Sequence, residues 1–221
     1  MGIFDFLSGP PNMATLKSNK DVEGLIKALK YKRDSNYYKD EMIRSEAAMA
    51  LGEIGDTRAV DPLIHALSDK SSDVRLVSVS ALGMIGDTRA IEIFIPVLMD
   101  RDCDLKLRLR LVWALGMIGE PAVDALIHAL ENTSDLDVRE GITMVLGAIG
   151  DVKAVEPIIH SMEDGWSREK AADALVLIGK PAVKPLTHAL RDDGALKNAS
   201  RRTRESAKNA LKKIRANKRR K

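Results

Sequence analysis

The chain is poor in cysteine and in aromatic residues, and both shortages narrow what it can be. Its 221 residues include one cysteine, Cys103, and 4% aromatic residues. A disulfide framework and a cluster of several thiolate ligands are excluded, which favours a reducing, cytoplasmic compartment. Few aromatics together with 30% charged residues argue against a large all-β fold and favour helix.

Long apolar runs are also missing. No stretch approaches the ~20 apolar residues that a membrane-spanning helix needs, so we expect no transmembrane segment. The first residues, Met1 to Phe6, lack the positive region of a secretory signal. A cytoplasmic location follows as the expectation.

A pentapeptide of the form Leu-Gly-x-Ile-Gly recurs along the chain. Intact copies begin at Leu51, Leu82, Leu115 and Leu146, and degraded copies begin at Leu175 and Leu211. Successive leucines are 31, 33, 31, 29 and 36 residues apart. Self-similarity at such a period is typical of solenoid repeats.

Each pentapeptide is preceded by an apolar segment with helical spacing. In one of them Val60, Leu63, Ile64 and Leu67 fall at i, i+3, i+4 and i+7. Equivalent segments lie at 22–29, 91–98, 123–130, 155–162 and 183–190. Each unit is therefore predicted to be two antiparallel helices, and six such pairs to stack into a right-handed all-α solenoid.

Glycines and acidic residues punctuate the predicted helices. The last glycine of each intact or degraded pentapeptide, from Gly55 to Gly179, is placed to close a helix in the left-handed conformation. Asp73 and Asp137 are the expected N-caps of two inner helices. The predicted organisation is an N-terminal arm at 1–20, a repeat domain of six helix pairs at 21–215, and a basic tail at 216–221.

These units resemble HEAT-like repeats of the phycobilisome-lyase type, which read Val-x-Pro-Leu-x-x-Leu, then Asp-x-x-Val-Arg, then Ala-Leu-Gly-x-Ile-Gly-Asp. The resemblance covers about residues 21–215 and implies the fold. That family includes chromophore lyase subunits, a di-iron hydroxylase and many scaffolds, so it implies no single activity. The hydroxylase branch carries His-Glu pairs on its inner helices, and the matching positions here hold none. We therefore expect no metal.

An arginine stands seven residues before each repeat leucine. The column comprises Arg44, Arg75, Arg108, Arg139, Arg168 and Arg204. It would serve either as a polyanion site or as a structural ladder. We favour the ladder, with each guanidinium bonding the loop acids that follow the glycines, namely Asp56, Asp87, Glu120 and Asp151.

The four histidines share one position of the outer helices. They are His65, His128, His160 and His188. Neighbouring helices pack roughly 8–10 Å apart, whereas zinc needs ligand nitrogens at ~2.0–2.1 Å, so one histidine per repeat does not close around an ion. We expect a solvated convex edge.

One face of the inner helices is unusually apolar in the middle repeats. The positions concerned are Met49, Leu76, Met84, Leu109, Trp113, Met117 and Met144. Such a strip predicts docking of a protein partner, for instance a helical segment. The alternatives are burial by solenoid curvature, cover by the N-terminal tip Ile3 to Leu7, or a homodimer.

Basic residues crowd the C-terminus. Residues 197–221 hold twelve Lys or Arg against one acid, Glu205. Contact with a polyanion is assigned to Lys212, Lys213, Arg215, Lys218, Arg219 and Arg220. No aromatic residue is interleaved for base stacking, so nucleic acid is not favoured over a soluble last helix or a tail folded onto the acidic body.

No enzymatic motif emerges from the chain. It has no Ser/His/Asp order with family context, no phosphate-cradling glycine loop and no Cys-x-x-Cys. The predicted function is a non-catalytic scaffold or adaptor, without cofactor, that holds a protein partner in the apolar groove. The alternatives are a lyase-like subunit gripping a bilin or tetrapyrrole in that groove, and a nucleic-acid-associated protein using the basic C-terminus.

Overall fold

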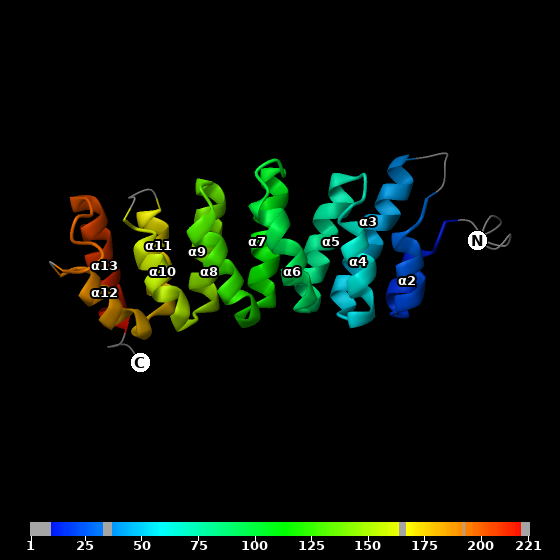
Figure 1. Cartoon of the computed structure of the whole chain (residues 1–221). Helices are drawn as coiled ribbons and strands as arrows, with labels where there is room; N and C mark the ends of the chain where they lie inside the picture. Colours follow the sequence, from blue (N-terminus) through cyan, green and yellow to red (C-terminus); the bar gives the residue numbers. More distant parts are fainter. Residues whose placement is uncertain (1–9, 33–36, 164–166, 192, 218–221) are drawn as a thin grey trace. The chain divides into compact units, whose positions relative to one another are not determined.

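The computed structural model describes residues 10–32, 37–163, 167–191 and 193–217, and these residues form helices and turns without strands (Figure 1). The chain divides into two compact units, Met1–Ala90 and Ile91–Lys221. The predicted all-α solenoid fold of six antiparallel helix pairs is confirmed within these ranges. No described helix is long and apolar enough to cross a bilayer.

Unit 1 contains two full helix pairs behind a short leading helix. Its helices are α1 (Met13–Ser18), α2 (Val22–Leu29), α3 (Tyr37–Ile54), α4 (Val60–Ala66) and α5 (Ser72–Ile85). Outer helices α2 and α4 contact each other, inner helices α3 and α5 do the same, and each outer helix packs on its own inner helix. The short α1, which packs on α2 and α3, lies inside the segment predicted as an arm.

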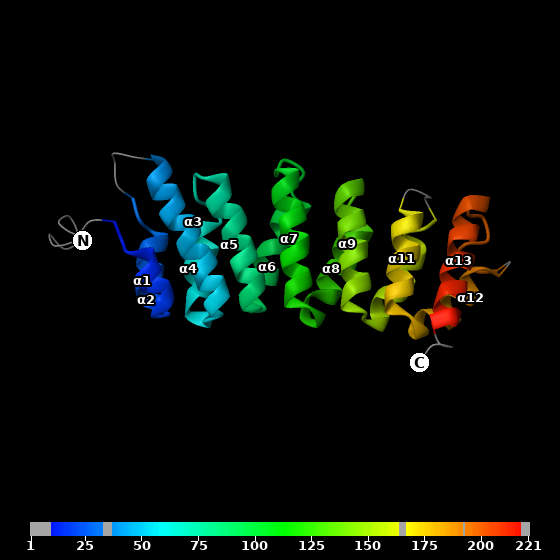
Figure 2. The same cartoon turned by 180° about the vertical axis from the view of Figure 1, so that it is seen from behind.

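Unit 2 repeats the two-layer arrangement. Its helices are α6 (Arg89–Met99, entering from the end of unit 1), α7 (Leu105–Ile118), α8 (Val123–Asn132), α9 (Leu136–Ile149), α10 (Val155–His160), α11 (Arg168–Ile178), α12 (Val183–Ala189) and α13 (Arg201–Asn217). Inner helices α7, α9, α11 and α13 stand side by side, and α8, α10 and α12 form the second layer (Figures 1 and 2). Single 3₁₀ turns lead from most inner helices to the next outer one, as at η3 (Glu120–Ala122), η4 (Val152–Ala154) and, in unit 1, η2 (Thr57–Ala59), whereas α5 is followed by α6 without one.

The two glycines of the pentapeptide have different roles. The last one closes the inner helix, and from Gly55 to Gly179 these glycines have φ of 75–84°. The predicted left-handed conformation is confirmed at Gly86 and Gly150, whereas Gly119 and Gly179 have ψ of −138° and −128°. The first one lets neighbouring inner helices approach. A Cβ on Gly147 would lie 2.6 Å from Ala174 Cα, and a Cβ on Gly52 would lie 2.7 Å from Ala81 Cα. A larger residue at position 147 would push α9 away from α11, and one at position 52 would push α3 away from α5.

The predicted helix N-caps need correction, and parts of the two predicted terminal segments fall outside the described residues. The N-caps of α5 and α9 are Ser71 and Asp135, whose side chains accept from the amides of Val74 and Val138. The expected caps, Asp73 and Asp137, lie inside the first turns instead. The tip Ile3 to Leu7 and residues 218–221 lie outside the described part of the chain, and α13 runs into the predicted tail.

Candidate functional site

A groove of ≈600 Å³ lies between the C-terminal halves of α7 and α9 in unit 2. Its walls are largely apolar and its end carries two acids. The lining residues are Trp113, Gly116, Met117, Gly119, Glu120, Val145, Ala148, Ile149, Gly150 and Asp151. Trp113 and Met117 are more than half exposed, at 56% and 55%. A large aromatic and a methionine are thus presented to whatever enters the groove.

The repeat motif itself builds this groove. Gly116 faces Val145, where a Cβ would lie 2.8 Å from Val145 Cγ1, so α7 and α9 are close together at the floor. The variable third residue of the pentapeptide is Met117 on α7 and Ala148 on α9. The loops after Gly119 and Gly150 then bring Glu120 and Asp151 to the groove's end.

The seven residues predicted as an apolar partner surface divide among different environments. In unit 1, Met49 and Met84 are 36% and 40% exposed, as expected for a solvent-facing strip. Leu76 on α5 is buried, at 8%, so it is not available to a partner as predicted. In unit 2, Met144 is 39% exposed, and Leu109 is half-buried near Gly141 of α9.

Several groove residues were absent from the predicted surface. Val145 and Ile149 belong to α9, and Glu120 and Asp151 to the loops. The prediction followed one face of each helix at a spacing of four residues. The groove instead runs between two helices and reaches their terminal loops. The acid that recurs after the closing glycine was the sequence feature from which Glu120 and Asp151 could have been found.

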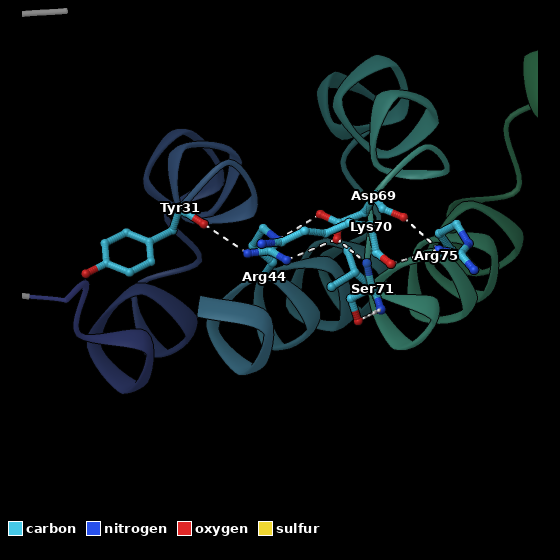
Figure 3. A network of polar contacts seen from close by, with 7 residues as sticks. Tyr31, Arg44, Asp69, Lys70, Ser71 and Arg75 are labelled. Carbon is cyan, nitrogen blue, oxygen red and sulfur yellow. Dashed lines mark hydrogen bonds and ion pairs between the residues drawn. The ribbon is translucent and has the colours of Figure 1, made fainter. Parts of the chain in front are cut away.

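The arginine column forms a polar network, but not with the predicted acids (Figure 3). Arg44, 5% exposed, donates from Nε to Asp69 Oδ2 at 2.7 Å and from Nη2 to Asp69 Oδ1 at 3.0 Å. Its Nη1 donates to the Tyr31 carbonyl at 3.2 Å. Arg75 donates to the carbonyls of Asp69 and Lys70. The partners therefore lie in loops that precede inner helices.

Unit 2 follows the same rule. Arg108 Nη2 donates to Asp135 Oδ2 at 2.8 Å, and Arg139 Nη2 to the Thr133 carbonyl at 2.9 Å. The predicted partners Asp56, Asp87 and Asp151 are out of reach for a geometric reason. The closing glycine lies eleven positions after each arginine, about 16 Å along the helix. The arginines therefore make their contacts near the N-terminal end of the inner helices, whereas those acids follow the C-terminal end.

The acids after the glycines pair locally instead. Arg58 Nη2 donates to Asp56 Oδ2 at 2.7 Å, and Arg89 Nη2 donates to Asp87 Oδ2 at 2.9 Å. The side-chain hydrogen bond from Arg58 lowers the pKa of Asp56, and that from Arg89 lowers the pKa of Asp87. Asp151 accepts from the amide of Lys153 at 2.8 Å. These contacts hold the short connections between helices, which are 3₁₀ turns at Asp56 and Asp151.

The remaining predicted residues lie on the surface. His65, His128, His160 and His188 are all exposed, and no group of metal-ligating side chains gathers among the described residues. Lys212, Lys213 and Arg215 are exposed on α13, where Lys213 lies 3.6 Å from Asp173. Lys218, Arg219 and Arg220 fall outside the described residues, and Arg168 lies 4.0 Å from Glu169.

Stacked helix pairs with glycine-closed inner helices define an α-solenoid repeat protein. The family model for HEAT repeats matches residues 22–102 and 92–169. The chain therefore belongs to the HEAT-repeat family.

Among curated proteins, similarity is confined to part of the chain. Bilin biosynthesis protein PecE of Nostoc sp. strain PCC 7120 is 36% identical over 86 residues, which make up 36% of this chain and 34% of that protein. Phycocyanobilin lyase subunit alpha of Picosynechococcus sp. strain PCC 7002 is 36% identical over 83 residues, 34% of this chain and 31% of that protein. The chain spans about a third of the length of these curated relatives.

Solved structures with a similar arrangement share 21% identity with the chain. Human deoxyhypusine hydroxylase in complex with glycerol aligns with a TM-score of 0.47, covering 92% of this chain and 77% of that one. The complex of CpcE and CpcF of phycocyanin lyase from Nostoc sp. PCC7120 aligns with a TM-score of 0.42, covering 91% and 85%.

The prediction of a non-catalytic scaffold or adaptor is wrong on these comparisons. The relatives in sequence are named for bilin biosynthesis and phycocyanobilin lyase, which favours the lyase-like alternative. The error has a physical origin, because repeat spacing specifies a stacked scaffold and an apolar face but not what that face binds.

Proposed function

We propose that the chain supplies the HEAT-repeat part of a bilin lyase-type subunit, and that the groove between α7 and α9 holds a linear tetrapyrrole. The observation that carries the proposal is the pairing of this groove, lined by Trp113 and Met117, with sequence similarity to bilin biosynthesis and phycocyanobilin lyase proteins. The groove's ≈600 Å³ lies within the range of small-molecule sites.

The lining of the groove suits the chemistry of a bilin. Its conjugated pyrrole rings are flat and apolar, and exposed Trp113 offers a face for stacking while Met117 and Ile149 offer adaptable apolar contact. Its pyrrole N–H groups are donors, and carboxylates accept such bonds strongly. Glu120 and Asp151 stand at the groove's end and would accept them.

A protein partner is part of the same proposal. The relative from Picosynechococcus is named as a lyase subunit, which implies assembly with another subunit. Met144 and Leu177, 39% and 65% exposed on α9 and α11, do not line the groove and would remain accessible to a protein, for instance a helical segment. We further propose a cytoplasmic location, consistent with the single cysteine.

Titration with phycocyanobilin tests the groove. In a Trp166→Phe background Trp113 is the sole tryptophan, and a bilin seated beside it is expected to quench its fluorescence with a saturable curve. Met117→Glu, which puts a charge against the apolar rings, is expected to weaken binding at least ~10-fold, corresponding to 1.4 kcal/mol or more.

Leu177→Glu is the matched control, since it introduces the same charge at an exposed apolar site outside the groove. It is expected to bind phycocyanobilin like the parent. Absence of saturable quenching, or equal weakening by both variants, contradicts the proposed function.

A further inference from the structure

The exposed face of α13 carries positive charge along its length. Ala207, Ala210, Leu211 and Ile214 are buried and define the packed side of the helix. The opposite side exposes Arg201, Arg202, Lys208, Lys212, Lys213 and Arg215, with Glu205 as the helix's one acid. The helix is therefore amphipathic, with an apolar side and a mainly cationic side.

Some exposed cations outside α13 are paired with acids, whereas others, such as Lys27 and Lys106, have no ion pair among the described residues. Arg58, Arg89 and Lys153 each lie within 3 Å of a carboxylate oxygen. On α13, Lys213 approaches Asp173 and Arg215 donates to Thr187 Oγ1 at 3.4 Å. The side chains of Arg201, Arg202, Lys208 and Lys212 have no ion pair or hydrogen bond with any residue in the described ranges.

The unpaired cations form a stripe rather than a scatter. Arg201, Lys208 and Lys212 are separated by seven and four residues, which places them on one face of a helix. Eleven residues of helix extend about 16 Å. A polar outer face keeps a repeat array soluble with either sign of charge, whereas cations outnumber acids on this face. Its one acid, Glu205, lies one turn after Arg201.

The composition of the stripe distinguishes among anionic partners. Protein interfaces have an apolar centre depleted in lysine, and the exposed face of α13 offers no large apolar side chain. A helix lying in a membrane surface also needs an apolar face free for insertion, whereas that of α13 is packed against its neighbours. A phosphodiester backbone needs only spaced cations, and contacts of this kind are sequence-independent.

We propose that the cationic face of α13 binds the phosphate backbone of nucleic acid without reading its sequence. This site is independent of the groove on α7 and α9. Four unpaired cations would release about four counterions from a duplex, which gives a slope of about −3.6 for log affinity against log salt. Between 50 and 200 mM salt the affinity would then fall about 150-fold.

Fluorescence anisotropy of the full chain with a 30-base-pair DNA duplex of mixed sequence tests the proposal. The variant Arg201→Glu/Lys208→Glu/Lys212→Glu is expected to lose binding at 50 mM salt by at least ~100-fold, while its circular dichroism melting curve remains that of a folded helical protein. A second duplex of unrelated sequence is expected to bind as well as the first.

Lys27→Glu/Lys30→Glu/Lys106→Glu is the matched control, because it changes net charge equally at exposed lysines outside α13. It is expected to retain most of the affinity. Equal losses in the two triple variants, no duplex binding by the wild type at 50 mM salt, or preferential capture of phosphatidylserine vesicles or poly-glutamate over the duplex overturns the proposal.

Discussion

At the scale of single residues, the burial of an ion pair decides how much it contributes to the stability of the repeats. Arg44 and Asp69 have side chains 5% and 14% exposed and meet through two hydrogen bonds, so removing either leaves a poorly solvated charge. Arg58 pairs with Asp56 at an equally short distance, but its side chain is 59% exposed. Pairs of that kind contribute little to stability, because water screens the attraction between the two charges.

The Arg108–Asp135 pair predicts a dependence of stability on pH. Burial works to raise the pKa of Asp135, but the Val138 amide and the Arg108 guanidinium outweigh it and lower the pKa below its usual value. A depressed native pKa adds stability above the unfolded value near 3.9, and that stability is lost as pH falls through the native pKa. Asp135→Asn is expected to be less stable than the wild type by about 1.5–3 kcal/mol at pH 7.

Urea unfolding at pH 7, 5 and 3 measures this effect. The difference between wild type and Asp135→Asn is expected to persist from pH 7 to 5 and to narrow toward pH 3, where the wild-type carboxylate begins to protonate. A gap that stays constant down to pH 3 would contradict the role assigned to this carboxylate.

At the scale of helices, close approach of neighbouring inner helices governs which small residues are replaceable. Gly141 and Gly147 both lie within α9, yet they face different surroundings. A Cβ on Gly147 would meet Ala174 Cα at 2.6 Å, whereas a Cβ on Gly141 would meet Leu109 and Val112 at an ordinary 3.5 Å. Backbone atoms of α11 give way far less readily than the end of a side chain.

Alanine substitution at these two glycines is expected to have opposite effects. Gly147→Ala should destabilise the protein by about 1–3 kcal/mol through overpacking. Gly141→Ala should stabilise it by about 0.5–1 kcal/mol, because alanine loses less backbone entropy in a helix. Thermal melts of the two variants beside the wild type measure both effects, and destabilisation by both would show that α9 tolerates no side chain at either position.

At the scale of the whole molecule, the chain consists of two units whose stability comes from contacts between adjacent repeats. Repeat arrays of this kind unfold approximately as a sum of local terms. Trp113 lies on α7 in unit 2, so in a Trp166→Phe background the tryptophan fluorescence reports on that unit. Circular dichroism, in contrast, follows the helices of both units.

A destabilising substitution in unit 1 is therefore expected to separate the circular dichroism transition from the tryptophan fluorescence transition. Gly52→Ala would bring a Cβ to 2.7 Å from Ala81 Cα and weaken the packing of α3 on α5. In urea its circular dichroism transition should begin at lower denaturant than the wild type, while the midpoint of tryptophan fluorescence should move less. Coincident shifts of the two signals would indicate a single cooperative unit.

The architecture was predictable from residue order, because helical periodicity and a left-handed closing glycine are local properties. The apolar spacing from Val60 to Leu67 and the positive φ at Gly55 each depend on neighbours in sequence. The exposure of Trp113 and Met117 followed from the same periodicity. Relatives named as bilin lyases, however, corrected the predicted function, since spacing carries no information about a ligand.

Other features depended on distances between segments that are remote in sequence. Leu76 on α5 is buried, and Arg44 on α3 reaches Asp69 in the loop that precedes α5. The groove exists because Gly116 admits Val145 of the next inner helix. Helical spacing tells which side of a helix a residue occupies, but packing between helices sets what lies opposite that side.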